Sequence, residues 1–303
     1  MQIFWIELNK LKYNDFLISL KSELKNPLTP LSGGTKNPPS PLFKGGIKNK
    51  KQKIIFTPNP EILLNTLKDQ EFKEFLQKAD YLTIDWIGIY IALQILENKN
   101  PLTPLSGGTI VNILLLPYYF FNLFFRRKYL YEKYWERICG SDLTKDLVEF
   151  AQKEGIKITI LDPYFPQDLK KCKAQDTFKD DLQKVFPKLD FDYFIYKKED
   201  KEEIINKICN SDSKILFSTL WMKSQEKSVV EVMEKCKNIK IWMWIGSSFD
   251  YFIGFQKRAP KFFRAIWIEW FYRIITWPQK LKRLKRLYNA IFVFIWKVLN
   301  YKK

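Results

Sequence analysis

IIFTPNPEILLNTLKDQEFKEFLQKADYLTIDWIG, residues 54–88, is the stretch of the chain that decides the fold. It predicts an apolar strand over 54–56, a turn, a helix from about Ile62 to Lys78, and a second strand over 81–84 that ends at Asp85. Two strands joined by one helix form a βαβ unit, which brings both strand ends to one edge of a parallel sheet. Ligands bind at that edge.

The turn of this unit has a sequence suited to starting a helix. Pro60 has no N–H to leave unpaired in the first helical turn, and Asn59 can cap that turn with its side-chain oxygen. Thr57 and Asn59 follow one strand, and Asp85 follows the other. We therefore expect Thr57, Asn59 and Asp85 to converge on one crevice.

Short strands alternate with helices through most of the remaining chain, which indicates an α/β fold with a Rossmann-like parallel sheet flanked by helices. An amino-terminal strand and helix are expected first, and a helix capped by Ser141 or Asp142 ends at Gly155. The expected strands are 3–6, 157–161, 192–196, 214–218 and 240–245, and the expected helices are 14–24, 142–154, 168–185, 201–210 and 224–236.

Composition limits the chemistry. The 303 residues contain no histidine, which excludes histidine-dependent triads and histidine metal ligands and leaves carboxylates as the natural general base. The formal net charge of +18 favours an anionic partner. Asp190-Phe-Asp192 matches an Asp-x-Asp pattern, but nothing around it supports metal binding. We expect neither a metal nor another cofactor.

The four cysteines, at positions 139, 172, 209 and 236, lie far apart in the sequence and form no CxxC pair. This spacing predicts neither a zinc site nor a disulfide framework and favours a reducing, cytosolic setting. Residues 1–9 lack the basic-then-apolar pattern of a signal peptide.

Two segments interrupt the α/β pattern. Residues 26–35 recur identically as residues 100–109, and both copies have the composition of loops. We interpret 26–53 as a loop insertion, and 98–131 as a second insertion that adds a hydrophobic run. That run, 110–125, is too short and too interrupted for a confident membrane span, so it favours a monotopic or re-entrant segment; a buried core helix is the alternative.

The carboxyl-terminal segment, 261–303, differs from the rest in charge and aromatic content. It holds eleven Lys or Arg residues, one acidic residue (Glu269) and twelve aromatic residues. Leu281, Leu284, Leu287 and Tyr288 form one helical stripe with basic residues on the other faces. We predict a basic amphipathic helical appendage to a 1–260 domain. An anionic membrane surface is favoured over nucleic acid as its partner, and a structural role is the alternative.

Several short motifs occur in one order along the chain, and together they resemble the WecG/TagA/CpsF family of glycosyltransferases. They are Thr57-Pro-Asn-Pro-Glu61, Asp85 to Gly88, Arg137-Ile-x-Gly-x-Asp-Leu143, Gln225-Glu226, Gly246-x-x-x-Asp-x-x-x-Gly-x-x-x-Arg-Ala-Pro260 and Glu269-Trp-x-x-Arg273.

The resemblance implies an inverting enzyme that needs no obligatory metal. It would transfer a sugar, of N-acetylmannosamine type, from a UDP-sugar donor to N-acetylglucosamine linked to undecaprenyl diphosphate. It would act at the cytoplasmic face of the membrane in cell-surface polysaccharide synthesis. It also implies that the carboxyl-terminal appendage docks on the bilayer and completes the site of a monomer in equilibrium with homo-oligomers.

By the same resemblance, Asp85 would be the general base. Thr57, Asn59 and Gln225 would lie beside the sugars; their alternative roles are turn bonds, helix capping and a solvated helix start. The candidates for the diphosphate are Arg137, Arg258, Arg264 and Arg273, because a guanidinium suits bidentate contact with phosphate. A surface charge or a structural ion pair is the alternative for each arginine.

This chain departs from the family pattern at glycine positions. Asp162-Pro163 stands where the family usually has Gly-Gly, Thr219 to Lys223 replaces a Gly-x-Gly-x-Pro pattern, and Trp86 follows Asp85 where glycine is common. Glycine permits close approach of backbone to ligand, so these changes reshape the pocket. They favour, as the alternative, an inactive membrane-associated scaffold or sugar-nucleotide-binding protein of the same fold.

Overall fold

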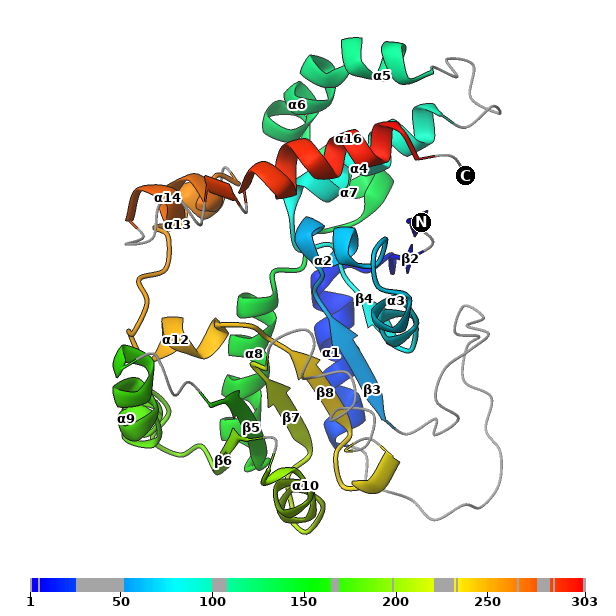
Figure 1. The fold of residues 1–303 in the computed structure, drawn as a ribbon. Helices are drawn as coiled ribbons and strands as arrows, with labels where there is room; N and C mark the ends of the chain where they lie inside the picture. The colour runs from blue at the N-terminus through cyan, green and yellow to red at the C-terminus, as the bar shows by residue number, and fades with distance from the viewer. Residues whose placement is uncertain are drawn as a thin grey trace.

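The computed structural model of the chain (Figure 1) describes residues 2–4, 6–25, 52–99, 108–164, 169–197, 199–220, 232, 234–265, 267–276, 284–285 and 287–301. The side chains of 169–171, 265, 273 and 274 are outside this description. Also outside it are the first repeat, residues 100–107 of the second, and most of the predicted helix 224–236.

A six-stranded parallel sheet forms the centre of the molecule, in the order β4-β3-β8-β7-β5-β6. This confirms the predicted α/β, Rossmann-like class. The register places Ile55 of β3 beside Tyr81 of β4 and Ile54 beside Trp242 of β8. The strands are β3 (Lys53–Phe56), β4 (Tyr81–Leu82), β5 (Ile158–Pro163), β6 (Phe191–Tyr196), β7 (Ile215–Ser218) and β8 (Ile241–Trp244).

Helices cover both faces of the sheet, so both faces are buried. Successive strand residues point to opposite sides and therefore belong to two different cores. Ile54, Phe56 and Trp242 belong to one core, with α2 (Pro60–Asn65), α3 (Gln70–Gln77), α4 (Ile87–Asn98) and α10 (Lys201–Cys209). Ile55 and Met243 belong to the other, with α1 (Tyr13–Lys25), α8 (Gly140–Glu154), α9 (Leu169–Val185) and α12 (Ser248–Phe252).

The helix predicted over 62–78 is wrong as one element, because the chain forms α2 and α3 with a turn between them. Thr66 ends α2 by donating its hydroxyl to the Leu63 carbonyl at 2.7 Å. Asp69 then caps α3 by accepting from the Phe72 amide at 2.9 Å. The local side-chain bonds of Thr66 and Asp69 compete with a continuous helix.

Two other local predictions need correction. The strand predicted over 3–6 is a small antiparallel hairpin, β1 (Gln2–Ile3) with β2 (Ile6–Glu7), which turns through Phe4 at φ 51°. Helix α8 begins at Gly140 without a side-chain cap, so neither Ser141 nor Asp142 is its cap. Its end is as predicted, with Gly155 in the left-handed region at φ 64°.

A disulfide joins Cys209 and Cys236, a pairing that the cysteine spacing did not predict. Cys209 ends α10 and Cys236 precedes β8, and both segments lie on the same side of the sheet. Sequence spacing does not report this contact, because the two residues are separated by β7 and a crossover. Cys139 and Cys172 are free thiols.

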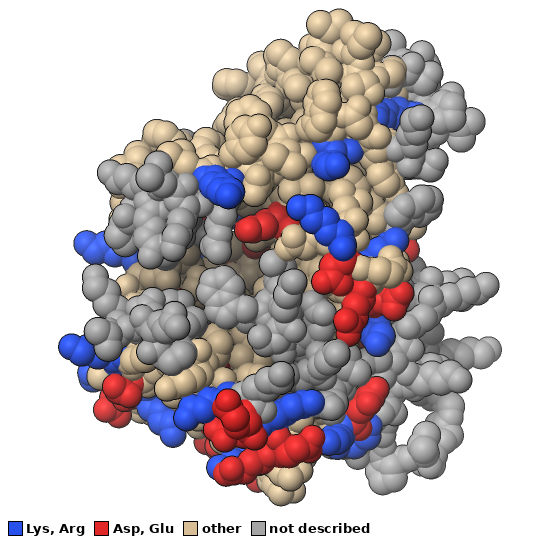
Figure 2. Space-filling view, in the orientation of Figure 1, with Lys and Arg blue, Asp and Glu red and all other residues tan. Residues whose placement is uncertain are grey.

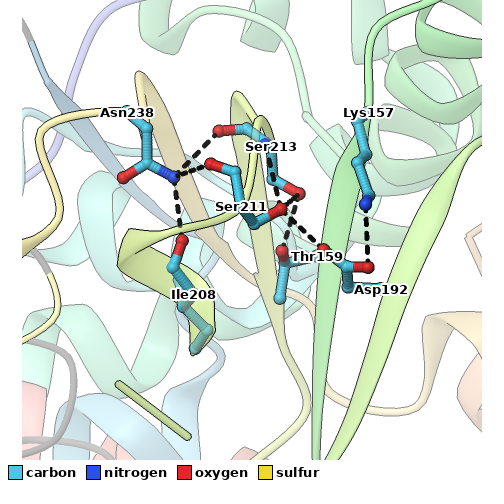
Figure 3. Close-up of polar contacts among 7 residues, drawn as sticks. All are labelled: Lys157, Thr159, Asp192, Ile208, Ser211, Ser213 and Asn238. Carbon is cyan, nitrogen blue, oxygen red and sulfur yellow. Dashed lines mark hydrogen bonds and ion pairs between the residues drawn. The ribbon is translucent and has the colours of Figure 1, made fainter. Parts of the chain in front are cut away.

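A polar network at the amino-terminal edge of the sheet contains Asp192 of the Asp-x-Asp pattern (Figure 3). Its carboxylate pairs with Lys157 at 3.0 Å and accepts from the Ser211 hydroxyl at 2.6 Å. Ser213 extends the network to Thr159 at 2.8 Å, and Asn238 donates to backbone carbonyls in the same region. Asp192 therefore joins β5, β6 and the start of β7.

The hydrophobic run 110–125 forms two helices, α5 (Thr109–Leu114) and α6 (Leu116–Phe125), followed by α7 (Arg127–Tyr134). Pro117 lies in the first turn of α6, where its missing N–H is tolerated, so the run divides there. Among the described residues, no helix is long and apolar enough to cross a membrane.

The carboxyl-terminal segment forms α13 (Lys261–Ala265), α14 (Glu269–Thr276), a π-helical turn η1 (Asn289–Val293) and α16 (Phe294–Leu299). Of the stripe expected over 281–288, Leu281 lies outside the described residues, while Leu284 and Tyr288 are exposed. Helix α16 packs on α4 and buries Phe294 and Val298 completely. The Phe4 ring meets Phe294 at 5.8 Å, so both ends of the chain share this core.

Replacing Asp69 with alanine removes the α3 cap, and we expect the free energy of unfolding to fall by about 1 kcal/mol. Urea denaturation followed by circular dichroism measures this loss. Lys68→Ala, at an exposed neighbouring position, is the matched control and should change stability little. Equal effects of the two substitutions would contradict the capping role.

Candidate functional site

A cavity of about 550 Å³ lies at the carboxyl-terminal edge of the sheet. Five strands each contribute a residue just beyond or at their ends: Thr57 after β3, Asp85 after β4, Asp162 at the end of β5, Thr219 after β7 and Gly246 after β8. A parallel sheet brings these ends together, so residues far apart in sequence share one pocket.

Thr57 and Asn59 lie at the pocket as predicted. Asn59 uses its Oδ1 atom to accept from the Ile62 amide at 3.0 Å, which leaves its side-chain N–H group as the donor it can offer to a ligand. Thr57 lies against the start of α8, where a Cβ on Gly140 would come within 2.6 Å of the Thr57 hydroxyl oxygen. Glycine at 140 therefore permits this close approach.

Asp85 and Arg137 are brought together by the backbone. The Ile138 amide donates to the Ile84 carbonyl at 2.8 Å, which holds residues 137–139 beside the end of β4. Burial would lower the pKa of Arg137, but Cys139, Asp85 and Glu269 raise it above its ordinary value. Arg137 therefore carries its positive charge between the proposed base and the carboxyl-terminal segment.

Arg258 and Arg264 do not line the cavity, although the sequence suggested a phosphate-binding role for both. Both instead approach one oxygen of Asp142, at 2.6 Å and 3.6 Å respectively. Each arginine thus forms the kind of ion pair named as its alternative role, and contact with a diphosphate stays a prediction for both. Gln225 and the side chain of Arg273 lie outside the described residues.

Five described residues of the carboxyl-terminal segment also line the pocket: Trp267, Glu269, Trp270, Leu287 and Ala290. Trp267 is buried and stacks on Tyr90 of α4, with ring centroids 5.4 Å apart and an interplanar angle of 17°. The Arg137 guanidinium lies 5.9 Å from the same ring. The sequence motif that contains Glu269 and Trp270 indicated that this segment contributes to the site, but no feature of the sequence indicated a role for Trp267.

A polar cluster surrounds Asp162, a residue at which this chain departs from the glycine pattern described above. Its carboxylate accepts from Gln175 at 2.6 Å, from Tyr193 at 3.0 Å and from the Thr219 hydroxyl. Burial, followed by the charge of Asp162, raises the pKa of Tyr193, which keeps the phenol protonated as a donor. Asp162, Gln175 and Thr219 all line the cavity, so this wall is polar and fixed by its own hydrogen bonds.

Acidic residues outnumber basic ones around the cavity. Among the described lining residues the acids are Glu61, Asp85, Asp162, Asp250 and Glu269, and Arg137 is the one cation. The start of α8 adds a second positive feature, because a helix amino terminus carries a partial positive charge. No group of three acidic or cysteine side chains in the described part of the chain is arranged to hold a metal ion.

The fold and the pocket define an α/β protein with a ligand site at the carboxyl-terminal edge of a parallel sheet. The sequence matches the Glycosyl transferase WecG/TagA/CpsF family over residues 42–112 and 123–303. The chain belongs to this family. It is a glycosyltransferase of cell-surface polysaccharide synthesis, and sugar donors and acceptors are its substrates.

Burial, and then the charge of Asp85, raises the pKa of the Cys139 thiol to about 11. A thiol stays neutral below its pKa, so at pH 8 Cys139 should hold about 100-fold less thiolate than an ordinary cysteine. We expect slow alkylation of Cys139 by iodoacetamide at pH 8, rising about tenfold per pH unit towards pH 11. Mass spectrometry of Cys172→Ser protein measures this rate, and a free cysteine peptide is the reference. A rate equal to that of the peptide at pH 8 would contradict the assignment.

Proposed function

We propose that this glycosyltransferase moves a sugar of N-acetylmannosamine type from a UDP-sugar to N-acetylglucosamine carried on undecaprenyl diphosphate, with inversion at the anomeric carbon. The observation that carries the proposal is Asp85, a carboxylate at the pocket edge held beside Arg137 by the Ile138–Ile84 backbone bond. The family and the absence of histidine support a carboxylate as the base.

In the proposed reaction, Asp85 takes the proton from the acceptor hydroxyl as that oxygen attacks the anomeric carbon. The bond between that carbon and the diphosphate breaks, and UDP leaves with the bonding electrons. Arg137 and the amino terminus of α8 would stabilise the charge that develops on the diphosphate. The reaction is proposed to need no metal or other cofactor.

The remaining parts of the proposal concern location and assembly. We place the protein at the cytoplasmic face of the membrane, as a peripheral or monotopic protein that meets anionic lipid and does not bind nucleic acid. The basic composition of residues 261–303 supports this placement. Homo-oligomers are proposed to exchange with the monomer.

An inactive scaffold or sugar-nucleotide-binding protein is the second candidate. The polar cluster around Asp162 favours it, because carboxylate and hydroxyl groups occupy the pocket wall where the family usually has glycine. A pocket changed in this way can hold a ligand without placing it for transfer. Turnover by purified protein decides between the two candidates.

Asp85→Asn keeps the size and hydrogen bonding of the side chain but removes the base. We expect transfer to fall by about 10³-fold, within the contribution of a general base, while binding of the UDP-sugar changes little. The assay uses detergent-solubilised protein, a panel of UDP-sugars and a short-chain lipid-diphosphate acceptor. Asp180→Asn, at an exposed position on α9, is the matched control. Full activity of Asp85→Asn would exclude Asp85 as the base.

Trp267→Ala tests whether the carboxyl-terminal segment completes the pocket. Without the stack on Tyr90, Glu269 and Trp270 lose their support, and we expect kcat/KM to fall by about tenfold or more.

Trp296→Ala, on the exposed side of α16, removes the same side chain from the same segment without touching the pocket, and it should retain activity. Thermal melting of both variants separates misfolding from loss of the site. An active, folded Trp267→Ala variant would contradict a contribution of this segment to the site.

A further inference from the structure

Helices α5 and α6 bury both of their asparagines and expose most of their apolar side chains. Asn112 and Asn122 are 0% and 1% exposed, whereas Ile110, Leu114 and Phe125 are each 75% exposed. In a helix that faces water, polar residues lie outside and apolar residues face the core. The polarity of this pair of helices is therefore reversed, which indicates that its outer face is not built for water.

The inner polar face is fixed by specific hydrogen bonds. Tyr119 donates its hydroxyl to Asn112 Oδ1 at 2.7 Å, and Asn98 of α4 donates to the same oxygen at 3.2 Å. Asn122 donates to Gln94 Oε1 at 2.7 Å. These bonds set the rotation of both helices on the protein, so exposure of the apolar side chains is a specified feature of the fold.

The outer face is wholly uncharged and ends in cations. Residues 108–125 contain no Asp, Glu, Lys or Arg, and Arg126 and Lys128, both exposed, follow directly. Arg126 stacks on Tyr129 at 4.9 Å. The exposed apolar side chains are Ile110, Val111, Ile113, Leu114, Tyr118, Phe121, Phe124 and Phe125. Figure 2 shows the corresponding uncharged end of the molecule, with Lys and Arg side chains below it.

We propose that the outer face of α5 and α6 is a docking surface that enters the apolar layer of an anionic lipid bilayer, with Arg126 and Lys128 at the headgroups. Apolar side chains beside aromatic and basic residues match the two layers of a membrane interface. A second copy of this chain would offer an apolar surface. Its own formal net charge is +18, however, so it would not supply an anionic partner for Arg126 and Lys128. The family match omits residues 113–122, which include Ile113, Leu114, Tyr118 and Phe121 of this surface.

The docking surface has a direct structural link to the pocket. Helix α16 packs on both α4 and α5, and Thr109 donates to the Leu299 carbonyl at 3.0 Å. Ala290, in the turn that leads into α16, lines the cavity. In Figure 1, α5, α6 and α16 gather at one end of the molecule. A docked surface would hold the pocket near the headgroups. This role rests on the proposed function, in which the acceptor is linked to a lipid.

Vesicle flotation of the full chain tests the proposal. The vesicles contain phosphatidylcholine alone or with about 30% phosphatidylglycerol. Leu114→Asp/Phe121→Asp/Phe125→Asp should bind at least about tenfold more weakly than the unchanged protein. The matched control is Ile18→Asp/Leu67→Asp/Val185→Asp, three equally drastic changes at exposed apolar positions elsewhere, which should bind normally. Arg126→Gln/Lys128→Gln should weaken binding to anionic vesicles only.

Two outcomes would overturn the proposal. One is normal flotation of the Leu114/Phe121/Phe125 variant. The other is a dimer of the unchanged protein, seen by sedimentation without lipid, that this variant alone converts to monomer, because the surface would then bind a second copy. Circular dichroism and melting confirm that the variants are folded.

A single-site label keeps the test independent of the triple substitution. A polarity-sensitive fluorophore on Phe121→Cys, in a Cys139→Ser/Cys172→Ser background, should shift to shorter wavelength with vesicles and be quenched by doxyl lipids. The same label on Ile18→Cys should not respond. A silent label at 121 would refute insertion.

Sugar transfer to a short-chain acceptor in detergent separates this inference from the proposed function. The Leu114/Phe121/Phe125 variant should transfer as fast as the unchanged protein. If no donor is turned over by any variant, the proposed function fails while flotation still decides the docking surface.

Discussion

The stack of Trp267 on Tyr90 is the contact on which the completed pocket depends. Tyr90 lies on α4, the helix that begins directly after Asp85 and Trp86. The ring on which Trp267 stacks is therefore part of the helix that follows the proposed base. Trp267 adopts φ 65°, a conformation that costs a non-glycine residue free energy, and its packing offsets that cost. The helix that follows then places Glu269 and Trp270 at the cavity. A segment more than 170 residues from Asp85 thereby becomes part of its surroundings.

The charges of the pocket are organised around Arg137. Five carboxylates line the described cavity, and a single guanidinium lies among them with its pKa raised by Asp85 and Glu269. Asp142 engages Arg258 and Arg264, which keeps both at the start of α8 and out of the cavity lining. These two ion pairs join α8 to the segment after β8. Arg137 is left as the described cation that a diphosphate would meet.

The hydrophobic insertion and the carboxyl-terminal segment form one structural unit with α4. The buried asparagines of α5 and α6 bond to Asn98 and Gln94, and α16 inserts Phe294 and Val298 into the core beside the same helix. Helix α16, part of the segment 261–303 that the sequence predicted to meet a membrane surface, is therefore partly a core element. Exposed apolar side chains lie on the insertion and also on this segment, where Phe292 and Trp296 are 63% and 58% exposed.

The sequence by itself determined the α/β class, most strand positions, and the convergence of Thr57, Asn59 and Asp85 on one edge. These follow from local hydrophobic periodicity, turn residues and the geometry of βαβ units. Only the tertiary structure decided the break between α2 and α3, the Cys209–Cys236 disulfide, the pairing of Arg258 and Arg264 with Asp142, and the role of Trp267. Each of the last three depends on a partner distant in sequence. The break depends on which of two competing local hydrogen-bond patterns packs better against the sheet, and a one-dimensional pattern does not contain that information.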